Sequence, residues 1–384
     1  MKKVKGLLKN IIKALIFKRI IRNNKLKFVR YFSEIKKRNP EIIVKQYSRK
    51  EEWEKKWSIF GEKPTDLGYI VFSHYMGENI NFVPNDIARS FIEPILTPEE
   101  YQPFYNDKNS LGMFIDKKIL PKTFLRSMNG RLYDGDYNHV SSNGFLSLLK
   151  GVDKLVLKPS MDMGGKGVVL FHRNGEEFID DNGCVLTLEY MKKAYNGNFL
   201  LQECLKQSPF MAQFNSTSIN TLRMATYRDV KTGEIILLGT VLRMGGEGAF
   251  VDNICSGGGF VIVDNNGRLG KTIYNEYGSS SHIHNNIDFE KQTFVVPNFD
   301  EIITFVKDVA RKMPHMSLFA NDIAIDENGK PVLIEVNTTQ FSYWLFQFHG
   351  KAVFDEHTDD LINYCVYESK KLKPTTTLKY DYKN

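Results

Sequence analysis

The chain has 384 residues, of which 42% are hydrophobic and 12% aromatic, enough to bury a large core in two or three domains or lobes. Lysines interrupt every apolar run well short of the roughly 20 residues that a membrane-spanning helix needs, which excludes a transmembrane segment. The four cysteines show no paired spacing, which excludes a disulfide framework and indicates reduced thiols in a cytoplasmic protein.

Positive charge is concentrated at the start of the chain. The net charge is +7, but residues 1–50 contain 17 Lys and Arg against 2 Glu, so the rest is mildly acidic. At 100° per residue, one side of a helix carries Lys2, Lys5, Lys9 and Lys13, and the other side carries Val, Leu and Ile of residues 4–15. We therefore expect a basic amphipathic helical arm over residues 1–50. It is a poor signal peptide, because Lys13 and Lys18 break its apolar region.

Three partners suit such an arm. A basic amphipathic helix fits the anionic inner surface of a membrane, and residues 1–30 would make this contact. The arm could instead dock on the body of the protein with a solvated basic face. Nucleic acid is the third partner, but no nucleic-acid motif accompanies the charge, so it is not expected.

Residues 51–150 form a mixed segment without an assigned catalytic role. Trp53, Trp57 and Phe60 indicate a helix that buries its aromatic side chains. The apolar run of residues 67–73 reads as a strand.

Two strands joined by a glycine-rich turn follow. Apolar runs end at Leu157 and begin at Val168, and Lys158, Gly164, Gly165 and Lys166 lie between them. Glycines let the backbone approach a ligand closely, and their amides can face phosphate oxygens. No helical pattern follows the glycines, so this is neither a Walker loop nor a dinucleotide fingerprint. A plain hairpin turn is the alternative.

Further apolar strands carry isolated polar side chains. Gln202 and Glu203 interrupt the strand at residues 200–205, and Arg223 and Arg243 lie among apolar neighbours in the strands that follow. Residues 296–313 show helical periodicity.

Residues 321–337 read as two strands joined by an Asn-Gly turn. With a two-residue loop at Asn328 and Gly329, Asp322 faces Glu335, and Glu335 shares a face with Asn337. Three oxygen ligands on a rigid sheet suit Mg²⁺. An ordinary hairpin with solvent-facing acids is the alternative.

In this order the motifs resemble the ATP-grasp superfamily, and more narrowly the sugar-transfer-associated ATP-grasp proteins of surface-polysaccharide gene clusters. The resemblance covers roughly residues 100 to 365. The matching motifs are Lys158-Pro159 with its glycine loop, Gln202-Glu203, residues 218–223, Val251-Asp252-Asn253, Asp322-Ile323-Ala324 and residues 334–337.

The resemblance implies an α+β fold in which two lobes grip the nucleotide, with the ATP-grasp domain at residues 151–370, a pre-grasp segment at residues 51–150 and a polar tail at residues 371–384. It implies ATP and Mg²⁺ as cofactors. Lys158, Lys166 and the glycine loop would bind phosphates, Gln202, Glu203 and Leu205 would border adenine and ribose, and Asp322, Glu335 and Asn337 would hold the metal. Arg223 and Arg243 would supply catalytic positive charge, and Asn220 and Asn253 are further candidates.

Two departures from the family pattern stand out. Amino-acid ligases of the superfamily usually carry an arginine two residues before the first metal-binding aspartate, where this chain has Ala320. His282 and His284 lie where the family often has a His-Pro stretch. They could form a metal or substrate pair, although loop histidines with ordinary partners are the plainer interpretation. Lys108 follows Asp107 as in the family's pre-grasp segment, but we assign it no role.

The implied function is an ATP-dependent ligase that joins a small-molecule or glycan carboxylate to an amine through an acyl phosphate, in bacterial surface-polysaccharide biosynthesis. A kinase or phosphotransferase with a hydroxyl acceptor, and a nucleotide-binding module without chemistry, are the alternatives. The expected location is the cytoplasm, peripheral at the inner face of the membrane. Since the nucleotide motifs begin near Lys158, deletion of residues 1 to about 30 should leave ATP binding intact. No oligomeric state is assigned.

Overall fold

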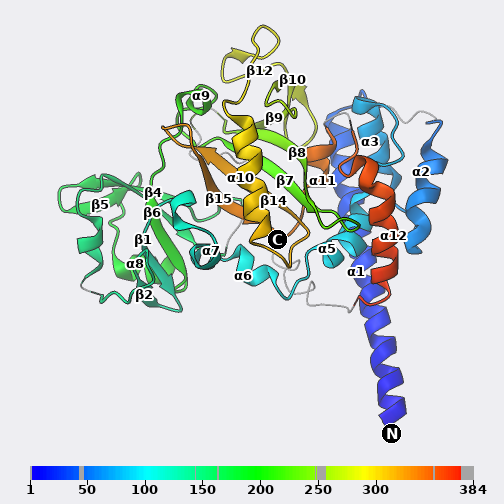
Figure 1. Ribbon diagram of the computed structural model, residues 1–384, viewed down its shortest axis with the longest axis horizontal. Coiled ribbons are helices and arrows are strands. Elements are labelled where there is room, and N and C mark those ends of the chain that lie inside the picture. Colours follow the sequence, from blue (N-terminus) through cyan, green and yellow to red (C-terminus); the bar gives the residue numbers. More distant parts are fainter. Residues whose placement is uncertain are drawn as a thin grey trace.

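The fold is that of a computed structural model, which describes residues 2–42, 47–142, 144–161, 164–246, 248, 257–348 and 351–372. For residues 2–10 it describes the backbone alone. Within this part of the chain, two antiparallel sheets dominate, and helices cover both faces of the larger one (Figure 1).

The smaller sheet has six strands in the order β2-β1-β6-β3-β4-β5. Its strands are β1 (Thr123–Met128), β2 (Arg131–Tyr133), β3 (Lys154–Pro159), β4 (Val169–Asn174), β5 (Glu177–Asp180) and β6 (Phe199–Glu203). Two helices pack with it, η4 (Phe145–Leu149) and α8 (Leu188–Ala194). The two predicted strands around the glycine turn are confirmed as β3 and β4, which pair directly.

The larger sheet has seven strands in the order β11-β10-β9-β8-β7-β14-β15. They are β7 (Thr221–Arg228), β8 (Ile235–Met244), β9 (Gly259–Val263), β10 (Leu269–Tyr274), β11 (Ser280–Ser281), β14 (Leu318–Ile325) and β15 (Pro331–Asn337). A separate pair is formed by β12 (Ile283–His284) and β13 (Ile287–Asp288). Every residue of β14 is buried, because both faces of this sheet are covered.

Successive residues of the central strands point to opposite faces and enter two different cores. Met224 packs with α10 (Phe299–Arg311), whereas Ala225 and Tyr227 pack with the helical layer on the other face. Helix α10 confirms the helix that the periodicity of residues 296–313 predicts. Short helices α6 (Gln102–Asn106), α7 (Lys108–Phe114), η3 (Lys117–Ile119) and α9 (Pro209–Ala212) lie in the connections.

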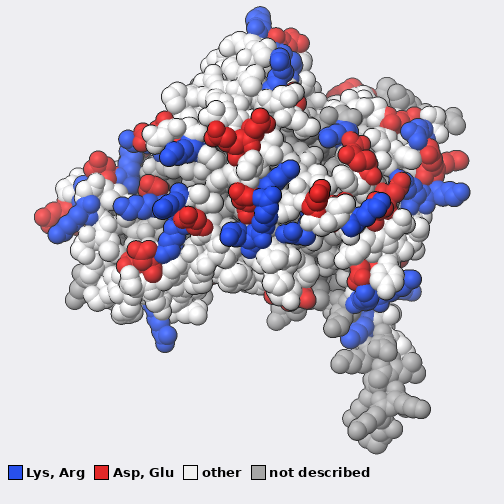
Figure 2. Space-filling model, in the orientation of Figure 1, with Lys and Arg blue, Asp and Glu red and all other residues white. Residues whose placement is uncertain are grey.

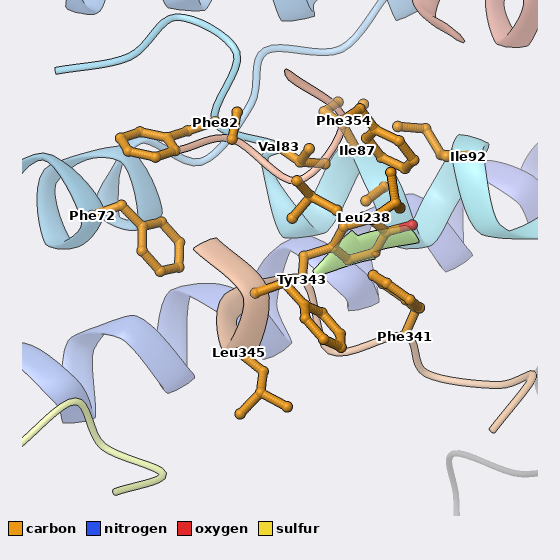
Figure 3. Close-up of a cluster of buried hydrophobic side chains, with 14 of the residues drawn as sticks. Phe72, Phe82, Val83, Ile87, Ile92, Leu238, Phe341, Tyr343, Leu345 and Phe354 are labelled. Atoms are coloured by element: carbon orange, nitrogen blue, oxygen red, sulfur yellow. The ribbon is translucent and has the colours of Figure 1, made fainter. Parts of the chain in front are cut away.

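The helical layer combines segments from both ends of the chain. It contains α1 (Lys2–Arg38), α2 (Lys50–Trp57), η1 (Ser58–Phe60), α3 (Asp66–Met76), α4 (Asn85–Ile87), the π-helix η2 (Ala88–Ile92), α5 (Glu93–Leu96), α11 (Tyr343–Gln347), η6 (Asp355–His357) and α12 (Thr358–Ser369). Figure 3 shows its centre, where Phe72 lies near Phe82, and Tyr343 lies near Phe354 and Leu238 of the sheet.

One expected strand is a helix. Residues 67–73 lie in α3, and Gly68 through Ser73 are all buried. An apolar run of this length can form a strand or a helix buried on every side, and periodicity cannot separate the two. Gly68 explains part of the choice, because a Cβ there would lie 3.0 Å from the ring of Phe32, so α3 packs closely against α1. The helix expected around Trp53 and Trp57 is confirmed as α2, which buries both rings.

The predicted arm is a helix that continues to Arg38 and is anchored in the core along its second half. Phe32 and Ile35 are buried, and the Asn24 side chain donates to Ser90 Oγ at 3.1 Å. Figure 1 shows the first turns extending away from the body. Among the described residues, no helix is long and apolar enough to cross a membrane.

The segment expected at residues 51–150 is divided between the two layers. Residues up to Leu96 pack in the helical layer, whereas β1 pairs with β6 inside the smaller sheet. Arg126, for example, lies opposite Leu200. The lobe that carries the glycine turn therefore begins near residue 123, before the predicted boundary at residue 150.

Candidate functional site

A cavity between the two sheets brings together most of the predicted site residues. It encloses about 1020 Å³, its mouth included. Its charged lining consists of five cations and three carboxylates: Lys108, Lys158, Lys166, Arg223, Arg243, Glu203, Asp322 and Glu335. Cations therefore exceed carboxylates by two, which favours an anionic ligand.

The smaller sheet contributes the lysines and the glycine turn. Lys158 is the penultimate residue of β3, and Gly164 and Gly165 both have positive φ values, of 69° and 73°, as a tight turn requires. Lys158 is deeply buried. Burial, helped by repulsion from Lys108, lowers the pKa of the Lys158 ammonium to about 8, although Glu335 opposes this shift.

Lys108 is the site residue to which sequence reasoning gave no role. It begins α7, and Asp107 caps this helix by accepting the backbone N–H of Asn109. Its ammonium lies 3.3 Å from Glu335 Oε2, and both side chains are largely buried. Its backbone N–H donates to the Ser160 carbonyl at 2.9 Å, next to the end of β3. Lys108 thus connects the smaller sheet with a carboxylate of the larger one. The signal in the sequence that could have identified Lys108 was its place directly after Asp107.

Asp322 is held by two arginines from neighbouring strands. Arg223 donates to both of its oxygens at 2.7 Å, and Arg243 Nη1 donates to Oδ2 at 2.9 Å. Burial alone would raise the pKa of the Asp322 carboxyl, but the two guanidinium charges outweigh it and hold this pKa below its usual range. Asp322 is therefore a carboxylate at neutral pH.

Asp322 and Glu335 are direct partners across β14 and β15, as predicted, but the loop differs from the predicted one. The hydrogen bond from the Asp326 N–H to the Lys330 carbonyl, at 2.9 Å, closes a three-residue loop that ends at Gly329, whose φ is +79°. This shifts the register by one residue, and a β-bulge beside Asp322 restores it. As a result, Ile334 and Glu335 both line the cavity although they are consecutive.

Apolar side chains from both sheets form the remaining wall of the cavity. Sequence reasoning did not identify them, because each looks like an ordinary strand or loop residue. They are Pro121, Val156, Val168, Leu205, Ile219 and Ile334. A slot with apolar walls beside a group of cations suits a flat ring that carries phosphates.

Three predicted residues lie outside this lining. Gln202 is buried and donates to Thr123 Oγ1 at 2.9 Å, which ties β6 to β1. The Asn220 amide donates to the carbonyls of Met211 and Asn215, both at 2.8 Å, so it holds a loop together. Asn337 lies two residues beyond Glu335, with a buried terminal amide atom that lacks a hydrogen-bond partner among the described residues. Residues 251–253 lie outside the described part of the chain.

The two histidines do not form a pair. His282 Nδ1 lies 2.8 Å from the Lys271 carbonyl, whereas His284 Nε2 lies 3.0 Å from the Gly245 carbonyl. Burial lowers the pKa of the His284 imidazole, and the Gly245 carbonyl opposes this shift. Each ring therefore has its own backbone partner, as expected of ordinary loop histidines.

The residues present fit a magnesium ion bound together with phosphates. Asp322 and Glu335 supply the two carboxylates that Mg²⁺ commonly takes from a protein. Because the two ends of a carboxamide are exchanged by a flip, the unpartnered atom of Asn337 can be an oxygen ligand. Within the described residues, no three His, Cys, Asp or Glu side chains form a metal cluster, so phosphate and water oxygens would have to complete the shell.

Comparison with known families decides the relationship. The sequence profile of the family described as sugar-transfer associated ATP-grasp matches residues 96–360, well over half of the chain. The chain belongs to this family. The α+β ATP-grasp fold expected from the motifs is thereby confirmed, with two sheets facing one cavity.

Solved structures similar to this ATP-grasp chain are distant. The biotin carboxylase domain of 2-oxoglutarate carboxylase from Hydrogenobacter thermophilus is 14% identical, with 71% of this chain and 47% of that chain covered and a TM-score of 0.40. N5-carboxyaminoimidazole ribonucleotide synthetase from Thermotoga maritima is 13% identical (70% and 52% covered, TM-score 0.36). D-alanine–D-alanine ligase from Bacillus anthracis is 12% identical (70% and 69% covered, TM-score 0.36).

The ATP-grasp chain spans about half the length of the first two of these structures. No curated protein matches its sequence.

Proposed function

We propose that the protein is an ATP-dependent ligase that phosphorylates a carboxylate and couples the product to an amine. The supporting observation is the cavity itself, which combines cations, apolar walls and two facing carboxylates in a chain of an ATP-grasp family. The five lining cations exceed the three carboxylates by two, which suits a nucleotide that arrives with its metal ion.

Each part of the cavity has a place in this proposal. Lys108, Lys158 and Lys166 would contact the phosphates as point charges. Val156, Val168 and Ile334 would enclose adenine. Glu203 and Leu205 would lie beside the base and ribose, with Glu203 Oε1 already fixed by the backbone N–H of Lys122 at 2.6 Å. Asp322, Glu335 and Asn337 would hold Mg²⁺, which would neutralise charge on the transferring phosphoryl group.

The proposed reaction has two steps. A carboxylate oxygen of the acceptor attacks the γ-phosphorus, and the bond to the β–γ bridging oxygen breaks, which leaves ADP. The amine then attacks the carbonyl carbon of the acyl phosphate, inorganic phosphate leaves, and the amine nitrogen loses a proton. Arg223 and Arg243 lie beside Asp322 in the same cavity, where fixed positive charge would stabilise the charge that develops in either step.

The setting proposed for this reaction is surface-polysaccharide biosynthesis, with a uronic acid as carboxylate and an amino acid or amino alcohol as amine. Only the description of the family supports this setting. Phosphoryl transfer to a hydroxyl group is the second candidate. It is favoured by Ala320, which stands where amino-acid ligases of the superfamily usually carry an arginine.

Hydroxylamine trapping separates the two candidates. The protein is incubated with ATP, Mg²⁺, hydroxylamine and a panel of free and nucleotide-linked uronic acids. A ferric-hydroxamate colour that depends on ATP is expected, because hydroxylamine attacks an acyl phosphate and not a phosphate ester. ADP formation with a phosphorylated sugar and no hydroxamate would assign the protein to the phosphotransferases. A nucleotide titration without any binding would contradict both candidates.

A further inference from the structure

Helix α1 has two different apolar stripes, and only one of them faces the protein. The first stripe packs in the helical layer and consists of Phe17, Ile21, Phe28, Phe32 and Ile35. The second consists of exposed side chains, with Ile11 and Ile12 each 48% exposed, Leu15 62% and Leu26 43%. At 100° per residue, the centres of the two stripes are separated by roughly 145° around the helix axis. The second stripe is therefore not a frayed continuation of the docked one.

Basic side chains share the exposed side of the helix. Arg19, Arg22 and Arg30 fall within the same arc as the second stripe, and all three are exposed. The helix sequence contains 14 Lys and Arg but a single acid, Glu34, which pairs with Arg38 near its end. Figure 2 shows blue basic side chains gathered where the helix leaves the body, beside the atoms drawn in grey. We call Ile11, Ile12, Leu15, Arg19, Arg22, Leu26 and Arg30 the outer face.

We propose that the outer face of α1 binds the surface of a bilayer that contains anionic lipids. Leucine and isoleucine can insert at the level of the headgroups while the arginines contact lipid phosphates. The helix lies in the plane of such a surface and does not cross it, in agreement with the finding that no described helix is apolar enough to span a membrane. The bound surface must be acidic, because the outer face carries three arginines and no acidic residue to balance their charge.

A bilayer suits the outer face better than two other binding partners, a second copy of the helix and nucleic acid. A second copy of the helix would bring two strongly basic faces together, and like charges on facing helices repel in either orientation. Nucleic acid would satisfy the arginines but would leave Ile11, Ile12 and Leu15 without an apolar partner. A bilayer surface offers phosphate groups and hydrocarbon side by side.

Vesicle co-sedimentation of the full chain tests the proposal without knowledge of the enzyme's acceptor. Wild-type protein is expected to sediment with vesicles that contain phosphatidylserine, and to stay in the supernatant with pure phosphatidylcholine. It should be released from the anionic vesicles at about 1 M salt, where the Debye length falls to about 3 Å.

Two triple variants separate the outer face from general stickiness. Ile11→Gln/Ile12→Gln/Leu15→Gln should weaken vesicle binding by about tenfold or more, since glutamine keeps the helix but removes the insertion. The matched control Ile59→Gln/Met113→Gln/Leu146→Gln changes three side chains on the body that are 54%, 57% and 52% exposed, and should bind like wild type. Unchanged thermal unfolding of each variant shows that the fold is retained.

Several outcomes would overturn the proposal. Wild-type protein that stays in the supernatant with both kinds of vesicle, or that sediments equally with both, contradicts it. So does an outer-face variant that binds like wild type. Concentration-dependent dimerisation that the same variant abolishes would assign the face to a second copy. Binding of a duplex oligonucleotide that survives the loss of Ile11, Ile12 and Leu15 would assign it to nucleic acid.

Discussion

At the scale of single residues, Asp322 takes its counter-charges from neighbouring strands. Arg223 is its direct partner on β7, and Arg243 reaches it from β8, one strand further away. The position two residues earlier, where related ligases carry arginine, is Ala320, which is buried against Ala225. Positive charge beside this carboxylate can therefore come from neighbouring strands instead of from its own strand. Spacing along one strand cannot reveal such a substitution.

Glu335 is the carboxylate whose removal should affect turnover most directly. It faces Asp322, contacts Lys108 and lines the cavity. We expect Glu335→Gln to lower ATP turnover on the order of 10²-fold, because an amide cannot balance the charge of a metal ion at the phosphates. ADP release under saturating ATP measures the effect.

The matched control for this variant is Glu327→Gln in the loop of the same hairpin, where the side chain is 58% exposed. It should turn over ATP like wild type. A folded Glu335→Gln protein with near-normal turnover would remove the metal assignment, whereas an unfolded one would be recognised by its thermal unfolding.

Lys158 makes nucleotide affinity depend on pH. Its ammonium pKa is lowered to about 8, so it is charged below this pH and increasingly neutral above it. A bound phosphate favours the charged form, so binding above pH 8 requires uptake of a proton. Affinity for ADP should therefore be level below pH 8 and then fall by up to about tenfold per pH unit. Isothermal titration across this range measures the slope.

Lys158→Arg provides the comparison, because a guanidinium keeps its charge throughout the range. Its affinity should stay level as the pH rises, whatever its absolute value. A wild-type profile that is also level would show that Lys158 does not contact the phosphates.

Much of the candidate site could be read from residue types in order. Lys158, the glycines, the arginines and the facing acids were found because charges and glycines stand out among apolar strands. The apolar wall could not be found in this way, since Val156 and Ile334 look like any buried strand residue. Asn220 shows the converse limit: its type suits a site, but its amide points into its own loop.

At the scale of elements, the hairpin of β14 and β15 shows how a correct pairing can follow from an incorrect loop. The predicted two-residue turn and the observed three-residue turn differ by one residue, and the bulge restores the register before Glu335. Bulges commonly redirect side chains near functional sites. Here the bulge allows one strand to present an apolar and an acidic side chain to the cavity in succession.

Two alanine variants test this arrangement. Leu333 is fully buried in the core between the large sheet and α10, so Leu333→Ala should lower the free energy of unfolding by about 2–5 kcal/mol. Ile334→Ala should cost much less stability but should weaken nucleotide binding, because Ile334 faces the cavity. Urea unfolding and a nucleotide titration are measured for both. The reverse pattern would mean that the strand runs without the bulge.

Strands marked by neighbouring charges or glycines and a helix with clear apolar periodicity were predictable, as β3, β4 and α10 confirm. Helix α3 was not, because burial on all sides removes the periodicity that separates helix from strand. The contact between Gly68 and Phe32 that favours it lies 36 positions apart in the chain and leaves no local signal.

At the scale of the whole molecule, the helical layer was the least predictable feature, because it depends on contacts between distant segments. Tyr31 lies 6.2 Å from Trp344, measured between ring centroids, and Phe72 lies 5.5 Å from Phe348. The charge of α1 was evident from composition, whereas its anchoring in this layer was not. Deletion of residues 1 to about 30 would remove side chains that pack in this layer, such as Phe17 and Ile21. A deletion that leaves the fold intact must therefore end before Phe17.

Deletion of residues 1–16 should leave thermal unfolding and nucleotide binding unchanged, because the first of the described side chains that packs in the helical layer is Phe17. Phe32→Ala should lower the free energy of unfolding by about 3–5 kcal/mol, since its ring is 2% exposed and packs edge-on against Phe72. Phe104→Ala, which changes a ring that is 47% exposed, is the control and should stay within about 0.5 kcal/mol of wild type. Equal losses from both substitutions would contradict the anchoring of α1.

The same anchoring has a consequence for how the protein is made. The aromatic side chains against which α1 packs include Trp344, which the ribosome adds roughly 300 residues after Tyr31. At about 5–20 residues per second, about 15–60 seconds pass between the synthesis of Tyr31 and that of Trp344, although α3 and η2, which also pack against α1, are made much sooner. Throughout that interval the docked stripe lacks its partners from the end of the chain, and the exposed stripe of the strongly basic helix has no partner in the protein. Apolar side chains that still lack partners could associate with those of neighbouring chains. The nascent chain therefore needs an acidic surface, a chaperone or the repulsion between its own positive charges to prevent this.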